Sequence, residues 1–272
     1  GHGFVGKATD YGFNKNIRKF IVDPIYDYSI DDLAAENPEV VFICVPTPMK
    51  DDGNQDATII ENVVKQTTEL LPDTLIIIKS TVLPSVLKKL CCYSKNLVYN
   101  PEFLREKHAK EDFINSSMVI FGGEKNLCKK ASKIYKNNSR CKSQEHIFLD
   151  MESASFVKYS INTFLATKVI FFNELYRVFA NLKSNDDWEK IIETIALDER
   201  IGNSHMNVPG HDGRYGFGGA CFPKDRAAFS SYSGNNDELS LLKTAIKKNN
   251  KIRGAYKELD VREKEQNVKY NN

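Results

Sequence analysis

Short apolar stretches rich in β-branched residues alternate with stretches of helical periodicity along the first half of the chain, and this alternation constrains the fold most strongly. The expected strands occupy residues 19–23, 39–48, 74–82, 96–103 and 117–123. Helices are expected between several of them, at residues 58–71 and 125–137. Strands that are apolar on both faces and separated by helices predict an α/β fold with a doubly wound parallel sheet.

A glycine pattern opens the chain, because GHGFVG at residues 1–6 fits the dinucleotide-binding pattern G-x-G-x-x-G. The strand at residues 19–23 ends in Asp23, close to the offset of about 20 residues at which an acid meets the adenosine ribose. An acid there repels a 2′-phosphate and favours NAD over NADP, although an ordinary strand-ending aspartate explains Asp23 equally well. We expect a Rossmann-like NAD-binding domain over residues 1–148, with the strand before its first glycine trimmed from the chain.

Polar residues follow three of the expected strands at their carboxyl ends, namely Thr47, Ser80 with Thr81, and Asn100 to Glu102. Ligands of open parallel sheets lie beyond the carboxyl ends of the strands. Turn chemistry explains each of these stretches alone, because VPTP and NPE are good strand-stopping sequences. Three polar strand ends at one rim favour the functional interpretation.

The second half of the chain is expected to be helical. Residues 152–182 carry apolar side chains at helical spacing, and residues 186–196 form a second helical stretch. Lys158 and Asn162 are four residues apart and therefore share one helix face. A solvated or snorkelling lysine is the ordinary explanation, and a Lys–Asn pair that stabilises an oxyanion in a cleft is the alternative.

The expected organisation of this half has three parts. A helical central domain spans residues 149–234, and a long helix follows at residues 235–260, with its periodic pattern at residues 238–259. That helix is suited to connecting domains or to dimerisation. The polar, charged tail at residues 261–272 is expected to be frayed.

The stretch YGFGGACFPKD at residues 215–225 concentrates three glycines, a cysteine, a lysine and an aspartate. Glycines let the backbone approach a bulky ligand closely. A thiolate at Cys221 gains stability from a helix N-terminus and from a nearby cation such as Lys224, which makes it a candidate nucleophile. The other five cysteines lack such neighbours, and Cys44, Cys91 and Cys92 are interpreted as structural.

Composition excludes several classes of function. The 38 basic and 36 acidic residues leave a net charge of +2, and no basic block suits a nucleic acid. No apolar run approaches the roughly 20 residues that span a membrane, and the cysteine spacing suits neither a metal site nor a disulfide framework. A reducing, cytoplasmic location is expected, in a host cytoplasm if the 24 asparagines reflect an AT-rich viral genome.

Seven motifs together resemble the UDP-glucose/GDP-mannose dehydrogenase family, in family order and at family spacing over essentially the whole chain. They read GHGFVG, CVPTP, KSTV, NPEFLRE, ESASFVKYSINTFLATKVIFFNE, RIG and GFGGACFPKD. The resemblance implies an oxidoreductase that uses two NAD in succession to oxidise the C6 hydroxyl of UDP-glucose to a carboxylate, giving UDP-glucuronate for a capsule, wall or other polysaccharide.

The resemblance also assigns roles in catalysis. Cys221 captures the C6 aldehyde as a thiohemiacetal, and a second hydride transfer then gives a thioester. Lys158 steadies the oxyanion, with Asn162 beside it.

Hydrolysis of that thioester falls to a further group of residues. Asp225 and Thr81 hold or activate a water, and Glu102 assists its attack. Lys224 supports the cysteine loop.

Two binding sets follow from the same motifs. The expected cofactor-binding residues are Gly1, Gly3, Phe4, Val5, Gly6, Asp23, Val45, Pro46, Thr47, Ser80, Thr81 and Glu102. The expected substrate-binding residues are Phe103, Leu104, Arg105, Glu106, Lys158, Asn162, Arg200, Tyr215, Gly216, Phe217, Gly218 and Gly219. The resemblance implies that Arg200 reaches the substrate of a neighbouring subunit, so a homodimer through the helical domain is expected.

One departure from the family leaves alternatives open, because family members continue into a C-terminal UDP-binding domain beyond the long helix. The chain is expected to be cut or a short form. Its alternatives are a dehydrogenase of GDP-mannose or UDP-N-acetylmannosamine, and a truncated, non-catalytic partner subunit. A two-electron 3-hydroxyacid dehydrogenase shares the Lys-x-x-x-Asn helix but has no use for Cys221.

Overall fold

The computed structural model describes residues 1–14, 16–234 and 238–270, and the chain forms two compact units. The first unit comprises Gly1–Thr47 and Asp56–Lys158, and the second comprises Pro48–Gln55 and Tyr159–Asn272. The division therefore falls within a long helix, α7 (Met151–Asn181).

The first unit is built on a five-stranded sheet in the order β1-β2-β3-β4-β5. Its strands are β1 (Val40–Ile43), β2 (Leu75–Ile78), β3 (Leu97–Tyr99), β4 (Val119–Gly123) and β5 (His146–Leu149). All four residues of β2 are buried, as expected for an apolar strand with a neighbour on each side. The predicted α/β fold is confirmed.

Two details of the expected sheet are wrong. Neighbouring strands are parallel except β3 and β4, which pair antiparallel through Val98↔Gly123 and Tyr99↔Gly122. Antiparallel neighbours need no crossover helix, and only two short helices lie between these strands. Strand β5 was not predicted, because it pairs only with β4 and carries two exposed residues among its four.

Residues 19–23 do not form the expected strand. They are outside the sheet, and the amino group of Gly1 donates a hydrogen bond to the Val22 carbonyl over 3.0 Å. A single hydrogen bond does not make a ladder, so the apolar sequence gives an irregular segment here.

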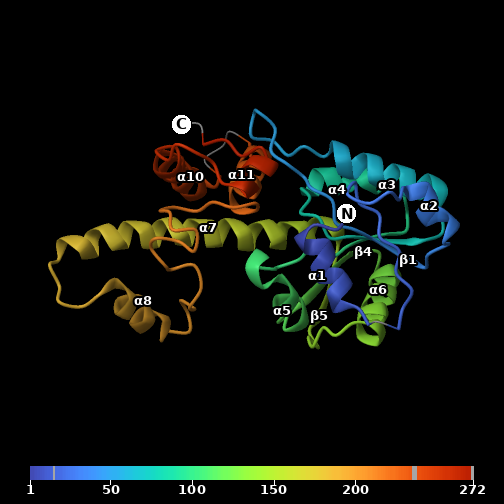
Figure 1. Ribbon diagram of the computed structural model, residues 1–272, viewed down its shortest axis with the longest axis horizontal. Coiled ribbons are helices and arrows are strands. Elements are labelled where there is room, and N and C mark those ends of the chain that lie inside the picture. The colour runs from blue at the N-terminus through green and yellow to red at the C-terminus, as the bar shows by residue number, and fades with distance from the viewer. Residues whose placement is uncertain (15, 235–237, 271–272) are drawn as a thin grey trace. The chain divides into compact units, whose positions relative to one another are not determined.

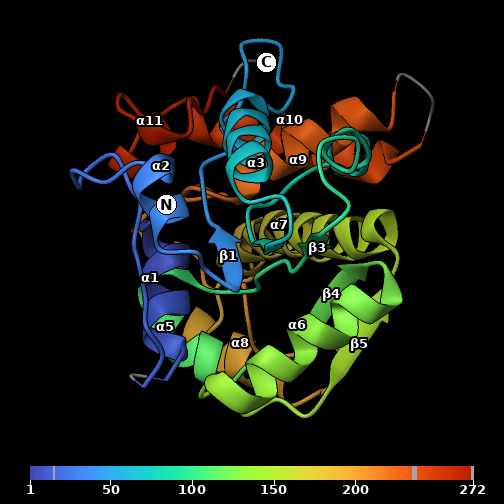
Figure 2. The same cartoon turned by 90° about the vertical axis from the view of Figure 1, so that its right-hand side faces the viewer.

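Helices cover both faces of the sheet (Figure 1, Figure 2). One face carries α3 (Thr58–Leu70), α4 (Pro84–Leu90) and the first turns of α7, and α2 (Ile30–Ala35) packs beside α3. The other carries α1 (Phe4–Gly12), α5 (Ala109–Ile114), which follows the short η1 (Glu106–His108), and α6 (Lys125–Asn138). Two apolar cores result, one on each face.

The second unit is helical in its described residues. It contains most of α7 together with α8 (Trp188–Ala196), α9 (Phe222–Tyr232), α10 (Ser240–Arg253) and α11 (Val261–Glu265). Residues 48–55 belong to it because Met49 donates to the Gln266 carbonyl and the side chain of Gln55 donates to the Tyr159 hydroxyl. The predicted helices at 152–182 and 186–196 are confirmed as α7 and α8.

The C-terminal predictions need correction. The helix expected at residues 238–259 is shorter, because α10 ends at Arg253 with Gly254 as its C-cap, and residues 235–237 of the longer expected range lie outside the described residues. The tail is not frayed as far as residue 270. It contains α11, whose Glu263 is fully buried, and Val268 is 2% exposed.

Candidate functional site

The glycine loop lies at the N-terminus of α1, where Gly3 is the N-cap residue. A Cβ at Gly1 would lie 2.6 Å from the Cys44 carbonyl oxygen, and one at Gly6 would lie 2.2 Å from the carbonyl oxygen of Gly1. A Cβ at Gly3 would meet nothing within 4 Å. Two glycines therefore permit tight packing of the loop, and the third leaves open space at the helix N-terminus, where an anion binds favourably. Phe4 and Val5 form the first turn of α1.

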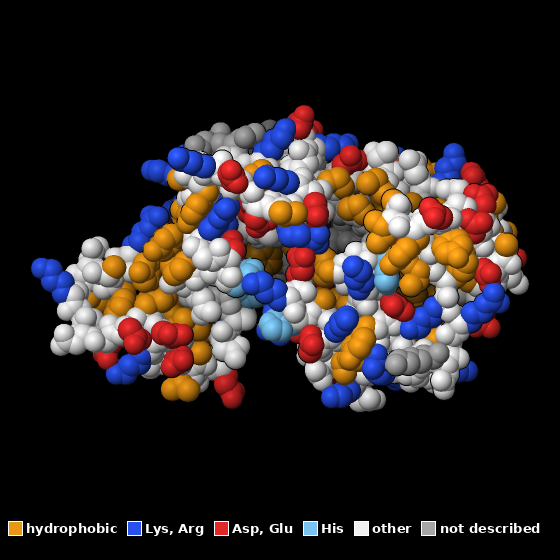
Figure 3. All heavy atoms as spheres, in the orientation of Figure 1, with side chains coloured by type: hydrophobic (Ala, Val, Ile, Leu, Met, Phe, Trp, Pro, Cys, Tyr) orange, Lys and Arg blue, Asp and Glu red, His pale blue; other side chains and the backbone are white. Residues whose placement is uncertain are grey.

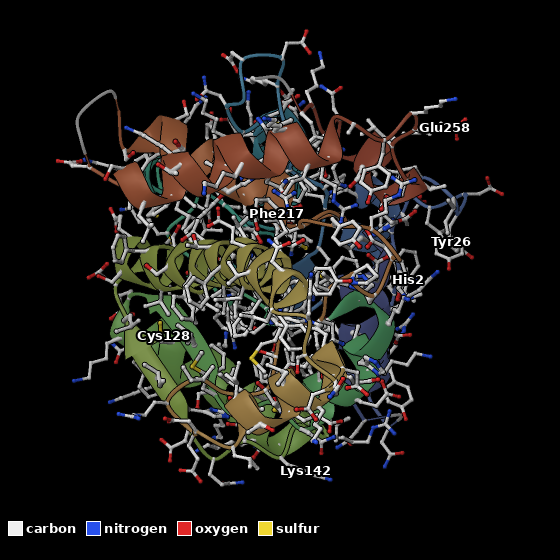
Figure 4. All side chains as sticks on the ribbon, turned by 90° about the vertical axis from the view of Figure 1, so that its left-hand side faces the viewer. His2, Tyr26, Cys128, Lys142, Phe217 and Glu258 are labelled. Carbon is white, nitrogen blue, oxygen red and sulfur yellow. The ribbon has the colours of Figure 1, made fainter. Side chains whose placement is uncertain are left out.

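Asp23 lies beside this loop. Its carboxylate accepts hydrogen bonds from the backbone N–H groups of His2, over 2.5 Å, and of Ile25, over 3.1 Å. Burial opposes ionisation, but these two bonds, together with the nearby charges of the chain's amino group and of His2, lower the pKa of Asp23. The His2 Nδ1 atom lies 3.1 Å from the Tyr26 hydroxyl (Figure 4). A fixed carboxylate next to a glycine loop fits the ribose and pyrophosphate of NAD.

The polar strand ends fasten β1 to β2. The Thr47 hydroxyl donates to the Thr81 carbonyl over 2.9 Å, and the Ser80 hydroxyl donates to the Val45 carbonyl over 2.6 Å. All four groups belong to the segments that follow these strands, as expected from the sequence. Pro46 lies between the two tethered residues of the first segment.

A buried lysine that sequence reasoning missed supports the next strand end. Lys79 is 3% exposed, and its Nζ donates to the Asn100 Oδ1 over 2.8 Å and contacts the Tyr135 hydroxyl at 3.1 Å. Burial lowers the pKa of Lys79 to about 8. A lysine directly after four apolar strand residues is the signal that could have found it. It holds the turn that leads to Glu102.

Glu102 and Lys158 form a buried pair in the first unit. The Lys158 Nζ donates to the Glu102 carbonyl over 2.5 Å and to its Oε1 over 3.3 Å. Their side chains are 3% and 4% exposed. The Lys158 Nζ also lies 5.1 Å from the centre of the Phe103 ring, and the Leu104 N–H donates to the Glu102 Oε2 over 2.6 Å. The ordinary explanation of Lys158 as a solvated lysine is therefore wrong.

The last two residues of the NPEFLRE segment, Arg105 and Glu106, are exposed. Arg105 forms a bidentate ion pair with Asp112, and Glu106 begins η1. An exposed side chain can rotate toward a ligand without leaving a buried partner unsatisfied.

The second unit holds Cys221 as the N-cap residue of α9. Its side chain is half-buried. The next turn carries Lys224 and Asp225, and the Lys224 Nζ donates to the Asp225 Oδ1 over 2.6 Å. The Asn162 amide donates to the Asp225 Oδ2 over 2.7 Å. Asp225, at 1% exposed, thus has both carboxylate oxygens occupied by donors that the sequence had singled out.

Two residues of the YGFGG segment bond side chains of α7 and α10. The Gly216 N–H donates to the Asn173 Oδ1, and the Phe217 N–H and carbonyl bond the side-chain amide of Asn249. Gly216 and Gly219 have φ angles of +73° and +78°, which favour glycine. The Tyr215 N–H donates to the Tyr256 hydroxyl.

Arg200 is an exposed residue of the second unit. Its side chain is 89% exposed and pairs with Asp198. Two other cysteines have perturbed thiols: burial raises the pKa of Cys44 and, to about 11, that of Cys128. A raised pKa suits a structural thiol better than a nucleophile.

No helix within residues 1–14, 16–234 and 238–270 is long and apolar enough to cross a membrane. Over the same residues, no group of three or more His, Cys, Asp and Glu side chains is arranged to hold a metal ion.

An α/β unit with a glycine loop at the N-terminus of its first helix is the architecture of dinucleotide-binding proteins. The sequence model of the NAD binding domain of the UDP-glucose/GDP-mannose dehydrogenase family matches residues 10–139, and that of the family's central domain matches residues 152–251. The chain therefore belongs to the UDP-glucose/GDP-mannose dehydrogenase family. The predicted family and NAD-binding domain are confirmed.

Individual relatives agree with this assignment. The UDP-glucose 6-dehydrogenase of Rickettsia bellii is 37% identical over 228 residues, which are 80% of this chain and 50% of the relative. The structure of a UDP-glucose dehydrogenase from Pyrobaculum islandicum matches with a TM-score of 0.69 at 28% identity, over 81% of this chain and 52% of that one. A GDP-mannose dehydrogenase from Pseudomonas aeruginosa matches with a TM-score of 0.56 at 25% identity, over 82% and 53%. The chain spans about half the length of these relatives.

Proposed function

We propose that the protein is an NAD-dependent sugar-nucleotide dehydrogenase that oxidises the C6 hydroxyl of UDP-glucose to a carboxylate through a thioester on Cys221. The family assignment supports the reaction class, and relatives named UDP-glucose 6-dehydrogenase support the sugar. GDP-mannose is the alternative substrate, supported by the similar GDP-mannose dehydrogenase.

The arrangement around Cys221 carries this proposal. A thiol at the N-cap residue of an eleven-residue helix lies at the positive end of the helix dipole, which stabilises the thiolate that attacks an aldehyde. Asp225, one turn further on, is held by Lys224 and Asn162. A buried carboxylate fixed in this way can orient a water for hydrolysis.

The first unit supplies the cofactor site. The glycine loop and Asp23 would hold NAD, which accepts a hydride in each of the two oxidations. Each oxidation also releases a proton to a base, first as the alcohol becomes an aldehyde and then as the thiohemiacetal becomes a thioester. Water then displaces the thiol and leaves the carboxylate.

The Lys158–Glu102 pair fits the charge changes of these steps. The Lys158 ammonium, 3% exposed, interacts strongly with a developing alkoxide because little water screens it. The Glu102 carboxylate keeps that ammonium paired and can assist the attacking water as a base. Thr81 provides a hydroxyl for the same water.

The test is the amount of NADH formed per mole of sugar nucleotide consumed. UDP-glucose, GDP-mannose and UDP-N-acetylmannosamine are compared with the wild-type chain, with Cys221→Ser and with the control Cys92→Ser. Cys92 is an exposed cysteine of the first unit. We expect two NADH per UDP-glucose for the wild type and the control, and loss of the second oxidation in Cys221→Ser.

Other outcomes exclude the proposal in different ways. Two NADH per GDP-mannose, with none from UDP-glucose, would change the substrate. One NADH regardless of Cys221 would identify a two-electron dehydrogenase. No NADH with any sugar, while NAD still binds, would favour a non-catalytic partner subunit.

We also infer that the chain forms a homodimer through α7. Phe164, Phe171 and Val178 are 55–66% exposed and spaced by seven residues, so they follow one face of the helix, and Leu182, 67% exposed, comes directly after its end. Figure 3 shows hydrophobic side chains gathered over this part of α7. A second copy would cover them, and Arg200, exposed on the same unit, is free to reach it.

The mass in solution tests the dimer. Light scattering should give twice the chain mass for the wild type and for the control Glu189→Gln on α8, and the mass of one chain for Phe171→Glu. A single-chain mass for the wild type would refute the inference.

A further inference from the structure

The C-terminal segment 260–270 contains a carboxylate with no exposure to solvent. Glu263 is 0% exposed, and its Oε1 accepts a hydrogen bond from the Tyr270 hydroxyl over 2.6 Å. Its Oε2 accepts the Asp260 N–H over 3.0 Å, which completes a capping box with the Asp260 side chain. Burying an ionised group requires such partners, so the segment folds around Glu263.

Glu263 faces a buried arginine of α10. The Arg253 side chain is 2% exposed, and its Nη1 lies 3.7 Å from the Glu263 Oε1 and 2.7 Å from the Asp212 Oδ2. Its Nη2 donates to the Gly216 carbonyl over 3.1 Å. One guanidinium thus connects the C-terminal segment to the loop that precedes Cys221.

The loop lies so close to these charges that only glycine fits. A Cβ at Gly218 would lie 2.4 Å from the Glu263 Oε1 and 2.8 Å from the Arg253 guanidinium carbon. A Cβ at Gly216 would lie 2.5 Å from the Asn249 Oδ1. Gly218 is three residues before Cys221, so a shift of Glu263 is transmitted to the thiol through very little chain.

A second buried arginine also contacts this loop. The Arg226 guanidinium is 5.0 Å from the centre of the Phe217 ring, and its Nη2 donates to the Asn250 Oδ1 over 2.8 Å. Burial lowers the pKa of Arg226 to about 10. Phe217 lies alongside α10 in Figure 4. The two arginines and the carboxylates of Asp212 and Glu263 balance in charge.

We propose that Glu263 is a positioning residue for Cys221: through Arg253 and Gly218 it fixes the loop that places the thiol at the N-terminus of α9. Segment 260–270 is thus part of the catalytic apparatus without touching the reacting atoms. The inference rests on the proposed function only in taking Cys221 as the nucleophile. Its test needs neither NAD nor a sugar nucleotide.

The experiment measures alkylation of the full chain by iodoacetamide from pH 6 to 10, with each cysteine quantified by peptide mass spectrometry. Wild type is compared with Glu263→Gln, Tyr270→Phe and the control Glu265→Gln, a partly exposed residue of the same helix that pairs with Arg262. Cys92, exposed in the first unit, is the internal reference.

We expect Glu263→Gln to slow alkylation of Cys221 at pH 7 at least fivefold and to move its midpoint to higher pH. The thiolate then loses its alignment with the N–H groups of α9, while Cys92 is unaffected. Tyr270→Phe removes one hydrogen bond from Glu263, and we expect about twofold slowing; it serves as the test if Glu263→Gln does not fold. Glu265→Gln should match the wild type.

A lower melting temperature with an unchanged Cys221 profile in Glu263→Gln would overturn the proposal, because Glu263 would then only stabilise the fold. Failure of the positioning role can be distinguished from failure of the proposed dehydrogenase activity. Altered alkylation in a chain that never forms NADH refutes the dehydrogenase alone, and unchanged alkylation in an active chain refutes the positioning role alone.

Discussion

Gly218→Ala would test the contact between the cysteine loop and the buried charges most directly. The added Cβ would lie 2.4 Å from the Glu263 Oε1, where ordinary contact begins at 3.4 Å. The Arg253 guanidinium carbon would lie 2.8 Å from the same Cβ. The side chains of Glu263 and Arg253 are almost fully buried, so neither can turn into solvent. The substitution must therefore displace the Arg253–Glu263 pair or the loop.

The magnitude follows from two costs. Overpacking a filled interior costs about 1–3 kcal/mol, and breaking a buried ion pair costs about 3–5 kcal/mol. The pair is only stretched here, because Glu263 keeps its bonds to Tyr270 and Asp260. We expect the free energy of unfolding of the second unit to fall by about 2–4 kcal/mol.

Gly219→Ala is the matched control. A Cβ there meets nothing within 4 Å, but φ is +78°, so the cost is backbone strain alone, about 1–2 kcal/mol. Urea unfolding is followed by the fluorescence of Trp188, the single tryptophan, which packs against Tyr176 in the second unit. A loss for Gly218→Ala no larger than that for Gly219→Ala would refute the predicted clash.

Three further predictions concern the first unit. Burial lowers the pKa of Lys79 to about 8 from 10.5, so the unfolded chain holds this proton more tightly and the stability contributed by Lys79 rises between pH 8 and 10.5. In urea titrations, the free energy of unfolding of the wild type should therefore rise by about 2 kcal/mol relative to that of Lys79→Met between pH 7 and 9.5. Asp23→Asn should raise the Kd for NAD at least about tenfold in calorimetry, because a charged hydrogen bond to the ribose is lost. Ser29→Ala removes the capping box of α2 and should cost about 1 kcal/mol, read from hydrogen exchange of that helix.

Each of these three predictions would be contradicted by a different result. Parallel pH profiles of wild type and Lys79→Met would mean that the lysine is neutral or hydrated when folded. An NAD affinity unchanged by Asp23→Asn, and equal to that of the exposed control Asp27→Asn, would remove Asp23 from the cofactor site. Unchanged exchange in α2 would show that tertiary contacts alone hold it.

Local sequence determined the helices whose apolar periodicity alone specifies their structure. The 3.6-residue periodicity predicted α3, α6 and α7 to within one residue at each end, because an apolar stripe suits only one regular structure. Prediction from local sequence failed where contacts with distant parts of the chain decide the secondary structure. Residues 19–23 have the composition of a strand but no ladder, and α11 forms although its segment is polar. The Asp260–Glu263 spacing was the available signal for that helix.

For the site, sequence identified the chemistry, and tertiary structure decided which charges work together. Cys221, Lys158 and Asp225 were found from residue type and motif. That Lys158 is buried against Glu102, and that Glu263 supports the loop before Cys221, could not be predicted. The free energy of a buried charge depends on partners that only the folded chain brings within hydrogen-bonding distance, and no local pattern records them.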